Sequence, residues 1–261
     1  MVLRESQAAE KQGANPSLDA QEIIDGLTGY MMGGHDSTHS TLTFMSKRLG
    51  KHQEIQATLR QALRDAHPSA HEERRQLTTD DIVRAQVPYL EAFIQEILRA
   101  DPPLPAVGRE VAVDMEILGH VIPKGTIILM PIQGPTLNAK GWDVPEAVRS
   151  ESSAKHADPG DWAETAYPGE EFNPERWLKR DQNGDVVYDA ASGPFMTFGS
   201  GKRGCWGQKL AYLELKLITS LLIWNFEFMP LPAEILDWEV EDDIFAKPKN
   251  TFVRIKSLLK I

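Results

Sequence analysis

The sequence has little cysteine, no long apolar run and no surplus of positive charge. Its 261 residues include one cysteine, Cys205, so no disulfide can form within the chain and the fold does not depend on an oxidising compartment. No segment approaches the ~18 consecutive apolar residues of a membrane-spanning helix, and the first residues show no signal peptide. The formal net charge of −10 disfavours binding to nucleic acid or anionic membranes. These absences favour a cytoplasmic protein without a membrane span.

What is present is the pattern of a mainly helical protein with small β-sheets. Residues 1–18 are polar and are expected to form a flexible lead-in, and residues 19–261 are expected to form one domain. Apolar periodicity and capping residues predict helices at about 19–49, 52–66 (stopped by Pro68), from Thr79, 89–100 and about 207–225. Short β-branched runs in 108–132 predict strands, and residues 141–170 resemble a surface loop.

The first predicted helix contains an unusual number of glycines. Asp19 and Glu22 form a capping-box pattern at its start. Gly26, Gly29 and the pair Gly33-Gly34 follow, and each glycine costs up to ~1 kcal/mol relative to alanine in a helix interior. A long helix with this composition indicates a close approach of the backbone to something else, or a kink.

A glycine-rich loop surrounds the one cysteine. Residues 198–207 read FGSGKRGCWG, and the glycines allow positive φ angles and close approach to a flat ligand. Cys205 lies where this loop meets the next helix, whose amino-terminal dipole favours a thiolate, and Arg203 supplies a cation for an acidic cofactor group. For a cysteine without context, a buried structural role is the alternative. A phosphate loop is excluded because Met196 stands where its first glycine belongs and Arg203 replaces Ser/Thr.

The spacing of this loop resembles the haem-binding signature of the cytochrome P-450 family, Phe-x-x-Gly-x-Arg-x-Cys-x-Gly. Its defining positions are filled here by Phe198, Gly201, Arg203, Cys205 and Gly207. The resemblance implies that Cys205 is the thiolate ligand of iron in a haem b cofactor and donates electron density that helps to cleave the O–O bond. It also implies that Phe198 packs near the sulfur and that Arg203 binds a haem propionate.

A second set of residues resembles a structural cluster of the same family. Glu96 and Arg99 stand three apart in the predicted helix 89–100 and can pair on one face, although such pairs are also common on solvated surfaces. In the family, Glu-x-x-Arg joins the arginine of a Pro-Glu-Arg segment, here Arg176. The resemblance implies a Glu96–Arg99–Arg176 cluster that holds the cysteine loop under the haem. Arg109 matches a position that often binds the other propionate.

The glycine-interrupted helix carries a third resemblance. Residues 33–38, GGHDST, resemble the family pattern Ala/Gly-Gly-x-Asp/Glu-Thr-Thr/Ser of the long helix on the distal haem face. The resemblance implies that Gly33 and Gly34 let the helix approach the iron and that Asp36 and Ser37 relay protons to dioxygen. Ser37 stands where threonine is usual, so the hydroxyl remains but its rotamer is less fixed.

The same stretch also allows a hypothesis of a different class. His35 and His39 stand four apart, which is the spacing of zinc ligands on a helix, and they resemble His-Glu-x-x-His of zinc hydrolases with Asp in place of Glu. No third ligand is evident among the other histidines, and a zinc site leaves Cys205 and its loop unexplained. In the simplest interpretation the two histidines are polar neighbours on a helix.

The resemblance covers nearly the whole chain but only about the second half of a typical family member. The implied fold class is mainly α with small β-sheets, the carboxy-terminal haem-binding half of the cytochrome P-450 fold. The implied function is a monooxygenase that inserts one atom of O2 into a small organic substrate, with electrons from NADPH–cytochrome P-450 reductase or a similar donor. The segments resemble those of fungal members that modify secondary metabolites, and full-length relatives are usually anchored to the endoplasmic reticulum. The alternative is a truncated, inactive fragment that keeps the motifs.

Overall fold

A computed structural model describes residues 10–11, 13, 21–117, 119–134, 169–241 and 244–258. The predicted lead-in 1–18 and the predicted loop 141–170 fall mostly outside these residues, as does the cap residue Asp19. Those three features therefore stay predictions, and so does the single domain 19–261.

Six helices and five pairs of short strands make up most of the described residues. The helices are α2 (Gln21–Lys51), α3 (Gln53–Ala66), α4 (Pro68–Glu72), α5 (Thr79–Arg84), α6 (Pro88–Ala100) and, after the strands β1 to β6, α9 (Gln208–Asn225). Short 3-10 turns are η2 (Pro174–Trp177), η3 (Gly201–Arg203) and η4 (Ala233–Ile235). Among the described residues, six helices against small two-stranded sheets confirm the predicted fold class.

The helix boundaries differ from the sequence prediction at two prolines. Pro68 follows the end of α3 as expected, but it also begins α4, and Pro88 begins α6 instead of preceding it. Proline suits the first helical turn because its missing N–H would have no partner there and its φ angle is already helical. The helix expected from Thr79 is capped by Thr78, whose hydroxyl accepts a hydrogen bond from the Asp81 N–H while the Asp81 carboxylate accepts one from the Thr78 N–H.

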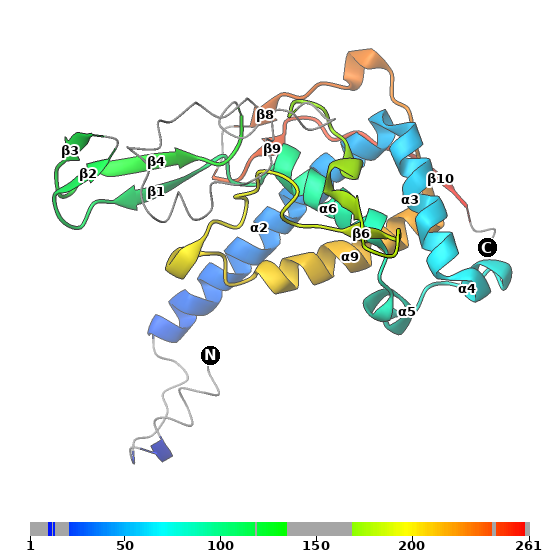
Figure 1. Ribbon diagram of the computed structural model, residues 1–261, viewed down its shortest axis with the longest axis horizontal. Coiled ribbons are helices and arrows are strands. Elements are labelled where there is room, and N and C mark those ends of the chain that lie inside the picture. The colour runs from blue at the N-terminus through cyan, green and yellow to red at the C-terminus, as the bar shows by residue number, and fades with distance from the viewer. Residues whose placement is uncertain are drawn as a thin grey trace.

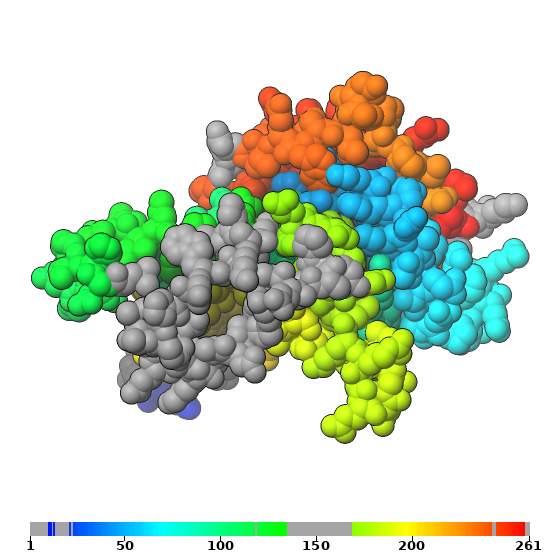
Figure 2. All heavy atoms as spheres, turned by 45° about the horizontal axis from the view of Figure 1, so that its top comes forward, coloured from blue at the N-terminus to red at the C-terminus, as the bar shows by residue number. Residues whose placement is uncertain are grey.

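All the sheets of the described residues are antiparallel pairs. β1 (Ala106–Glu110) pairs with β4 (Ile127–Pro131), and β2 (Met115–Ile117) pairs with β3 (His120–Ile122). The other pairs are β5 (Leu178–Arg180) with β6 (Val186–Tyr188), β7 (Phe226–Met229) with β10 (Arg254–Ser257), and β8 (Val240–Glu241) with β9 (Lys247–Pro248). Strands β1 to β4 extend to one side of the helices (Figure 1) and form a separate lobe at the edge of the space-filling view (Figure 2).

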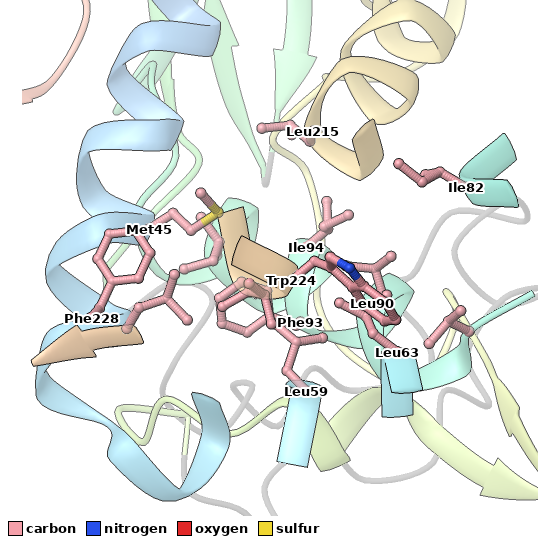
Figure 3. Close-up of a cluster of buried hydrophobic side chains, with 14 of the residues drawn as sticks. Met45, Leu59, Leu63, Ile82, Leu90, Phe93, Ile94, Leu215, Trp224 and Phe228 are labelled. Carbon is pink, nitrogen blue, oxygen red and sulfur yellow. The ribbon is translucent and has the colours of Figure 1, made fainter. Parts of the chain in front are cut away.

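The hydrophobic core lies where α3, α6, α9 and the second half of α2 meet. Met45, Leu59 and Phe93 are fully buried there, and Phe228 and Trp224 come to them from the carboxy-terminal part of the chain (Figure 3). Since α9 and α6 both pack against this part of α2, the loop that precedes α9 is brought to the middle of α2. The core therefore sets the position of the cysteine loop relative to the glycine-rich stretch of the long helix.

Candidate functional site

The cysteine loop is a tight backbone structure stabilised by its own hydrogen bonds. Gly199 and Gly201 have φ angles of +63° and +65°, which favour glycine. The N–H of Cys205 donates to the carbonyl of Phe198 at 2.8 Å, and the N–H of Gly204 donates to the carbonyl of Gly201 at 3.1 Å. These turns leave Cys205 exposed, three residues before the first residue of α9. The thiol is therefore presented near the amino terminus of α9.

A cavity of about 300 Å³ lies between the cysteine loop, α2, β1 and α9. Six of the residues singled out from the sequence line it: Gly33, Ser37, Arg109, Phe198, Arg203 and Cys205. Gly34, Asp36, Gly201 and Gly207 are not among its described lining residues. Most of the remaining lining is apolar and comes from Leu98, Pro103, Leu104, Val107, Ala211, Leu215 and Phe245. The structure therefore gathers residues from four distant segments around one mainly apolar space.

The α2 side of the cavity has a hydroxyl that interacts with its own helix. Ser37 Oγ donates to the carbonyl of Gly33 at 2.6 Å, and the carbonyl of Ser37 accepts a hydrogen bond from Thr41 Oγ1 at 3.0 Å. A methyl group added to Gly33 or Gly34 would meet no described atom within 4 Å. Within the described residues, no packing contact therefore requires glycine at these two positions, although Gly33 faces the cavity.

Asp36 and the two histidines lie on the outer side of α2. The Asp36 carboxylate interacts with His35 Nδ1 at 3.1 Å, and this hydrogen bond lowers the pKa of Asp36. His35 is 82% exposed, and its ring stacks on that of His39 with 6.4 Å between the centroids. In the part of the chain that the structure describes, no three His, Cys, Asp or Glu side chains come together as a metal site would need. The zinc hypothesis is therefore unsupported.

Two arginines bring positive charge to the cavity wall. Arg109 lies on β1, and its Nη1 donates to the carbonyl of Gly108 at 2.8 Å. Arg203 ends the turn η3 in the cysteine loop. Neither guanidinium has a carboxylate partner among the described residues, so both remain available for an acidic ligand.

The predicted Glu96–Arg99–Arg176 cluster is present and buried. Arg99 Nε and Nη2 donate to the two carboxylate oxygens of Glu96, each at 2.8 Å, and Arg176 Nε lies 3.6 Å from Glu96 Oε2. The side chains of Glu96 and Arg99 are 0% and 2% exposed, so this pair is not a solvated surface pair. Burial lowers the pKa of Arg176, and the negative charge of Glu96 counteracts that effect.

Two residues of this cluster were not singled out from the sequence. Trp177 Nε1 donates to Glu96 Oε2 at 2.8 Å, and the N–H of Asn173 donates to Glu96 Oε1 at 2.9 Å. Asn173 and Trp177 flank Arg176 at the short turn η2. Their position near Glu96 could therefore be inferred from the sequence only after Arg176 had been assigned to the cluster. With them, the Glu96 carboxylate accepts hydrogen bonds from two segments of the chain.

A row of aromatic rings connects this cluster to the cysteine loop. The ring of Phe195 lies 6.2 Å from that of Trp177 and 6.1 Å from that of Phe198, measured between centroids. Phe198 lies 5.2 Å from Tyr212 of α9, and Thr197 Oγ1 donates to the carbonyl of Leu98 at 2.7 Å. The loop is therefore positioned by α6 below it and by α9 behind it.

The residues around the cavity fit the haem that the sequence resemblance implies. A flat, mostly apolar group with two carboxylates and a central iron needs an apolar space, two cations and one soft ligand. The described walls supply apolar side chains, the guanidinium groups of Arg109 and Arg203, and the thiol of Cys205. The hydroxyl of Ser37 lines the same space from α2.

The chain is similar in sequence to known proteins of one family. The family model "Cytochrome P450", here written cytochrome P-450, matches residues 1–152 and 153–254. The cytochrome P-450 monooxygenase TRI13 of Fusarium sporotrichioides is 34% identical over 98% of this chain and 45% of its own length. The Hps1-dma1 cluster cytochrome P-450 monooxygenase cyp3.1 of Dothistroma septosporum is 32% identical over 97% of this chain and 84% of its own length.

A solved structure supports the fold. The crystal structure of the cytochrome P-450 CYP102L1 superposes with a TM-score of 0.68 at 20% identity, over 98% of this chain and 50% of that chain. The chain spans about half the length of the first of these curated relatives. None of the helices in the described residues has the length and apolar character needed to cross a bilayer.

Proposed function

Because the chain belongs to the cytochrome P-450 family of haem-thiolate iron enzymes, we propose that it is a monooxygenase that inserts one atom of O2 into a small organic substrate. One observation carries the proposal. The thiol of Cys205, the guanidinium groups of Arg109 and Arg203 and the hydroxyl of Ser37 come from separate segments and line the same apolar cavity. A structural cysteine in a glycine-rich turn would not need the cations or the hydroxyl.

The cysteine loop and the two arginines would hold the cofactor. Cys205 supplies the thiolate to the iron of haem b, and Phe198 covers that side of the cavity. Arg109 and Arg203 neutralise the two propionates. Gly201 and Gly207 act on the backbone, because Gly201 allows the positive φ angle and Gly207 precedes α9. The bound haem supplies the iron at which dioxygen is activated, with electron density from the thiolate.

Residues of α2, on the other wall of the cavity, would transfer protons. Gly33 keeps α2 free of a side chain beside the cavity, and Ser37 presents its hydroxyl to it. Asp36 precedes Ser37 and lies towards solvent with His35, so it would exchange protons with water and pass them to the Ser37 hydroxyl. Since the Ser37 hydroxyl now donates to the carbonyl of Gly33, it must turn to take part.

The buried ion cluster would have a structural part in this function. Glu96, Arg99 and Arg176 fix the turn η2, and the ring of Trp177 transmits that position through Phe195 to the cysteine loop. None of the three charged residues lines the cavity as described. Their effect on catalysis would therefore come from holding Cys205 in place.

The proposed partners and substrate class are those that the family implies. A flavoprotein such as NADPH–cytochrome P-450 reductase would deliver the electrons. A role in secondary metabolism is supported by the similarity to fungal monooxygenases, one of which is named for a gene cluster. The substrate would be a small organic molecule.

A second candidate is an inactive partial protein that keeps the motifs. It is favoured by Met31 and Tyr30 of α2, which are 74% and 52% exposed. An apolar helix surface of this kind leaves one side of the cavity with little cover among the described residues. Haem binding separates the two candidates.

The test is the reduced, carbon-monoxide difference spectrum of the purified chain supplied with haem. The proposal predicts a strongly red-shifted Soret band in the chain and its loss in Cys205→Ala, because only a thiolate ligand gives that shift. Trp206→Ala is the matched control, since Trp206 is the next residue and is 86% exposed. The same band in Cys205→Ala would remove Cys205 from the iron. A chain without the band would be the inactive fragment.

A further inference from the structure

One apolar wall of the candidate cavity is a short stretch of chain that has a hollow on its other side. Pro103, Leu104 and Val107 line the candidate cavity, whereas Pro102 and Pro105 line an outer cavity of about 540 Å³. The residues between α6 and β1 therefore form a wall that separates two cavities. A wall with a hollow behind it lacks packing contacts on that side. Its position depends on the few points at which it is attached.

The wall is attached at three points. The carbonyl of Pro103 accepts a hydrogen bond from the N–H of Ala246 at 2.8 Å, and the carbonyl of Pro105 accepts one from the N–H of Ile132 at 2.9 Å. The third point is Asp101, which follows the last residue of α6 and precedes the first proline of the wall. Among the described hydrogen bonds of residues 101–107, those of the Asp101 carboxylate are the ones that reach α2 directly.

Asp101 is bound by Arg48, which lies near the end of α2. Arg48 Nε donates to Asp101 Oδ2 at 2.8 Å, and Arg48 Nη2 donates to Asp101 Oδ1 at 2.9 Å. The two side chains are 16% and 9% exposed. Two parallel charge-assisted hydrogen bonds fix a direction as well as a distance, which one bond does not. The pair therefore sets where the wall begins relative to α2.

The guanidinium group of Arg48 also contacts two aromatic rings from distant parts of the chain. Its Cζ lies 4.9 Å from the ring centroid of Phe172 and 4.4 Å from that of Trp238. Phe172 directly precedes Asn173, which bonds to the Glu96 cluster. A planar guanidinium that stacks on aromatic rings loses less freedom when it binds a carboxylate. The rings therefore orient Arg48 towards Asp101.

We propose that Arg48 is a positioning residue that sets how closely the apolar wall fits a ligand in the candidate cavity. It does so by binding Asp101 and thereby fixing residues 102–107. The inference rests on the monooxygenase function proposed above, in which the wall contacts the organic ligand. Arg48 does not line that cavity as described, so its effect reaches the ligand only through the wall. A displacement of the wall by about 1 Å is enough to weaken the fit, because contact energies fall steeply with distance.

The position of the wall is tested by amide hydrogen exchange of the chain as purified, followed by nuclear magnetic resonance. The amides of Ala246 and Ile132 report on the wall, because they donate to the carbonyls of Pro103 and Pro105. Arg48→Gln should raise the exchange rates of both amides by about tenfold through local opening. Unchanged rates overturn the inference.

Two further variants control this measurement. Arg75→Gln removes an arginine that binds Asp81 at 2.7 Å and that does not line the candidate cavity as described, so it should leave both rates unchanged. An equal rise in Arg75→Gln would show a general loss of stability and overturns the inference. Arg48→Lys keeps the charge but not the paired donors, so it should give intermediate rates. It also replaces Arg48→Gln as the test if that variant does not fold.

The fit of a ligand is tested with two azoles of different size on the haem-loaded chain. Imidazole and phenylimidazole bind to iron through the same nitrogen, and the shift of the Soret band gives both dissociation constants. In Arg48→Gln the dissociation constant of phenylimidazole should rise by about tenfold, because the larger ligand depends on a correctly placed wall. That of imidazole, which is too small to need the wall, should stay unchanged. An equal change for the two ligands, or no change for either, overturns the inference.

The route through Asp101 is tested by a double-mutant cycle with phenylimidazole. Asp101→Asn should raise the dissociation constant as Arg48→Gln does, and the double variant should be no weaker than the weaker single variant. Additive losses would show that the two residues act separately, and they overturn the inference.

The two possible failures can be told apart. Unchanged azole binding in Arg48→Gln, with a normal reduced carbon-monoxide spectrum, overturns the inference and leaves the proposed function standing. No red-shifted band in the unaltered chain overturns the proposed function, and the inference about ligand fit falls with it even if hydrogen exchange shows that Arg48 positions the wall.

Discussion

The two halves of helix α2 lie in different surroundings although they form one continuous helix. In the first half Ile24, Leu27 and Met31 are 46%, 47% and 74% exposed, whereas Met45 and Leu49 in the second half are 1% and 0% exposed. Among the described residues, no group of helices packs around the first half of α2 as α3, α6, α9 and β7 pack around the second half. Helix continuity comes from local hydrogen bonds, while burial comes from distant parts of the chain.

The same division separates the polar residues of the molecule. Buried Ser40, Lys47 and Glu96 all have specific partners, since Ser40 donates to the carbonyl of Ala246 and Lys47 to that of Asn250. Exposed pairs such as Arg84 with Asp80, at 3.1 Å, are open to solvent on both sides. A group in the enclosed region therefore contributes through a fixed set of contacts, and a group outside it contributes little. Four measurements test this contrast, from the largest expected effect to the smallest.

Glu96→Gln should give the largest loss of stability. Removing the carboxylate charge takes away the ion-pair partner that Glu96 gives to the buried guanidinium groups of Arg99 and Arg176, which should cost about 3–5 kcal/mol of unfolding free energy. Asp80→Asn breaks an exposed pair and should cost about 0–1 kcal/mol. Urea denaturation of both variants measures the two values. Equal losses would mean that burial does not distinguish the two pairs.

Leu49→Ala should cost about 2–5 kcal/mol, because the side chain is fully buried and leaves a cavity. Met31→Ala, in the exposed half of the same helix, should change the unfolding free energy by about 0.5 kcal/mol or less. Thermal unfolding followed by circular dichroism compares them directly. A large loss in Met31→Ala would show that the first half of α2 is packed in solution.

Two glycines should respond with opposite signs. A Cβ at Gly193 would lie 2.6 Å from Cη2 of the Trp177 ring, so Gly193→Ala should cost about 1–3 kcal/mol. A Cβ at Gly29 would meet nothing within 4 Å, and Gly29→Ala should stabilise the helix by up to about 1 kcal/mol. Denaturation midpoints report both. Stabilisation by Gly193→Ala would contradict the close packing of Trp177.

His52 should make the smallest of these contributions, and it should depend on pH. Burial, together with the charges of Arg48 and Lys51, lowers the pKa of His52 from 6.5 to about 4. The unfolded chain therefore binds this proton more readily, and the contribution is full above pH 6.5 and is lost as the pH falls towards 4. After allowance for solvent screening it should amount to about 1 kcal/mol.

His52→Gln isolates this contribution. The difference in unfolding free energy between the variant and the unaltered chain should change between pH 6.5 and 4 and stay constant above that range. His120→Gln, at an exposed strand position, should leave the pH profile as it is. A parallel profile for His52→Gln across the whole range would show that His52 is not desolvated.

The parts of this molecule that follow local rules could be predicted from the sequence. The helices at α3, α6 and α9 are within one residue of the periodicity prediction, since their apolar residues repeat at helical spacing. The Glu96–Arg99 pair is also local, three residues apart on one helix. The boundaries predicted at Pro68 and Pro88 differ from the structure because a proline in the first turn of a helix and a proline that stops a helix look alike in sequence.

The contacts that could not be predicted join residues far apart in the chain. Thr38 and Glu214 are 176 residues apart, and Trp177 reaches Glu96 across 81 residues. Neither contact has a spacing rule, because the meeting of two side chains depends on how whole helices pack. The resemblance to a family singled out Arg176 and Arg109, and the structure places Arg176 beside Glu96 and Arg109 at the cavity wall.

The enclosure of α2 by the last part of the chain has a kinetic consequence. Ser40 and Lys47 bond to the carbonyls of Ala246 and Asn250, which follow them by 206 and 203 residues. During synthesis α2 can form its own hydrogen bonds early, but these two partners leave the ribosome only after nearly all of the intervening chain. Contacts of such long sequence separation slow folding, because a large loop must close before they form. Until the residues around Ala246 and Asn250 have been made, the side of α2 that carries Ser40 and Lys47 lacks these two partners. Chaperones would have their main opportunity to bind α2 during this time.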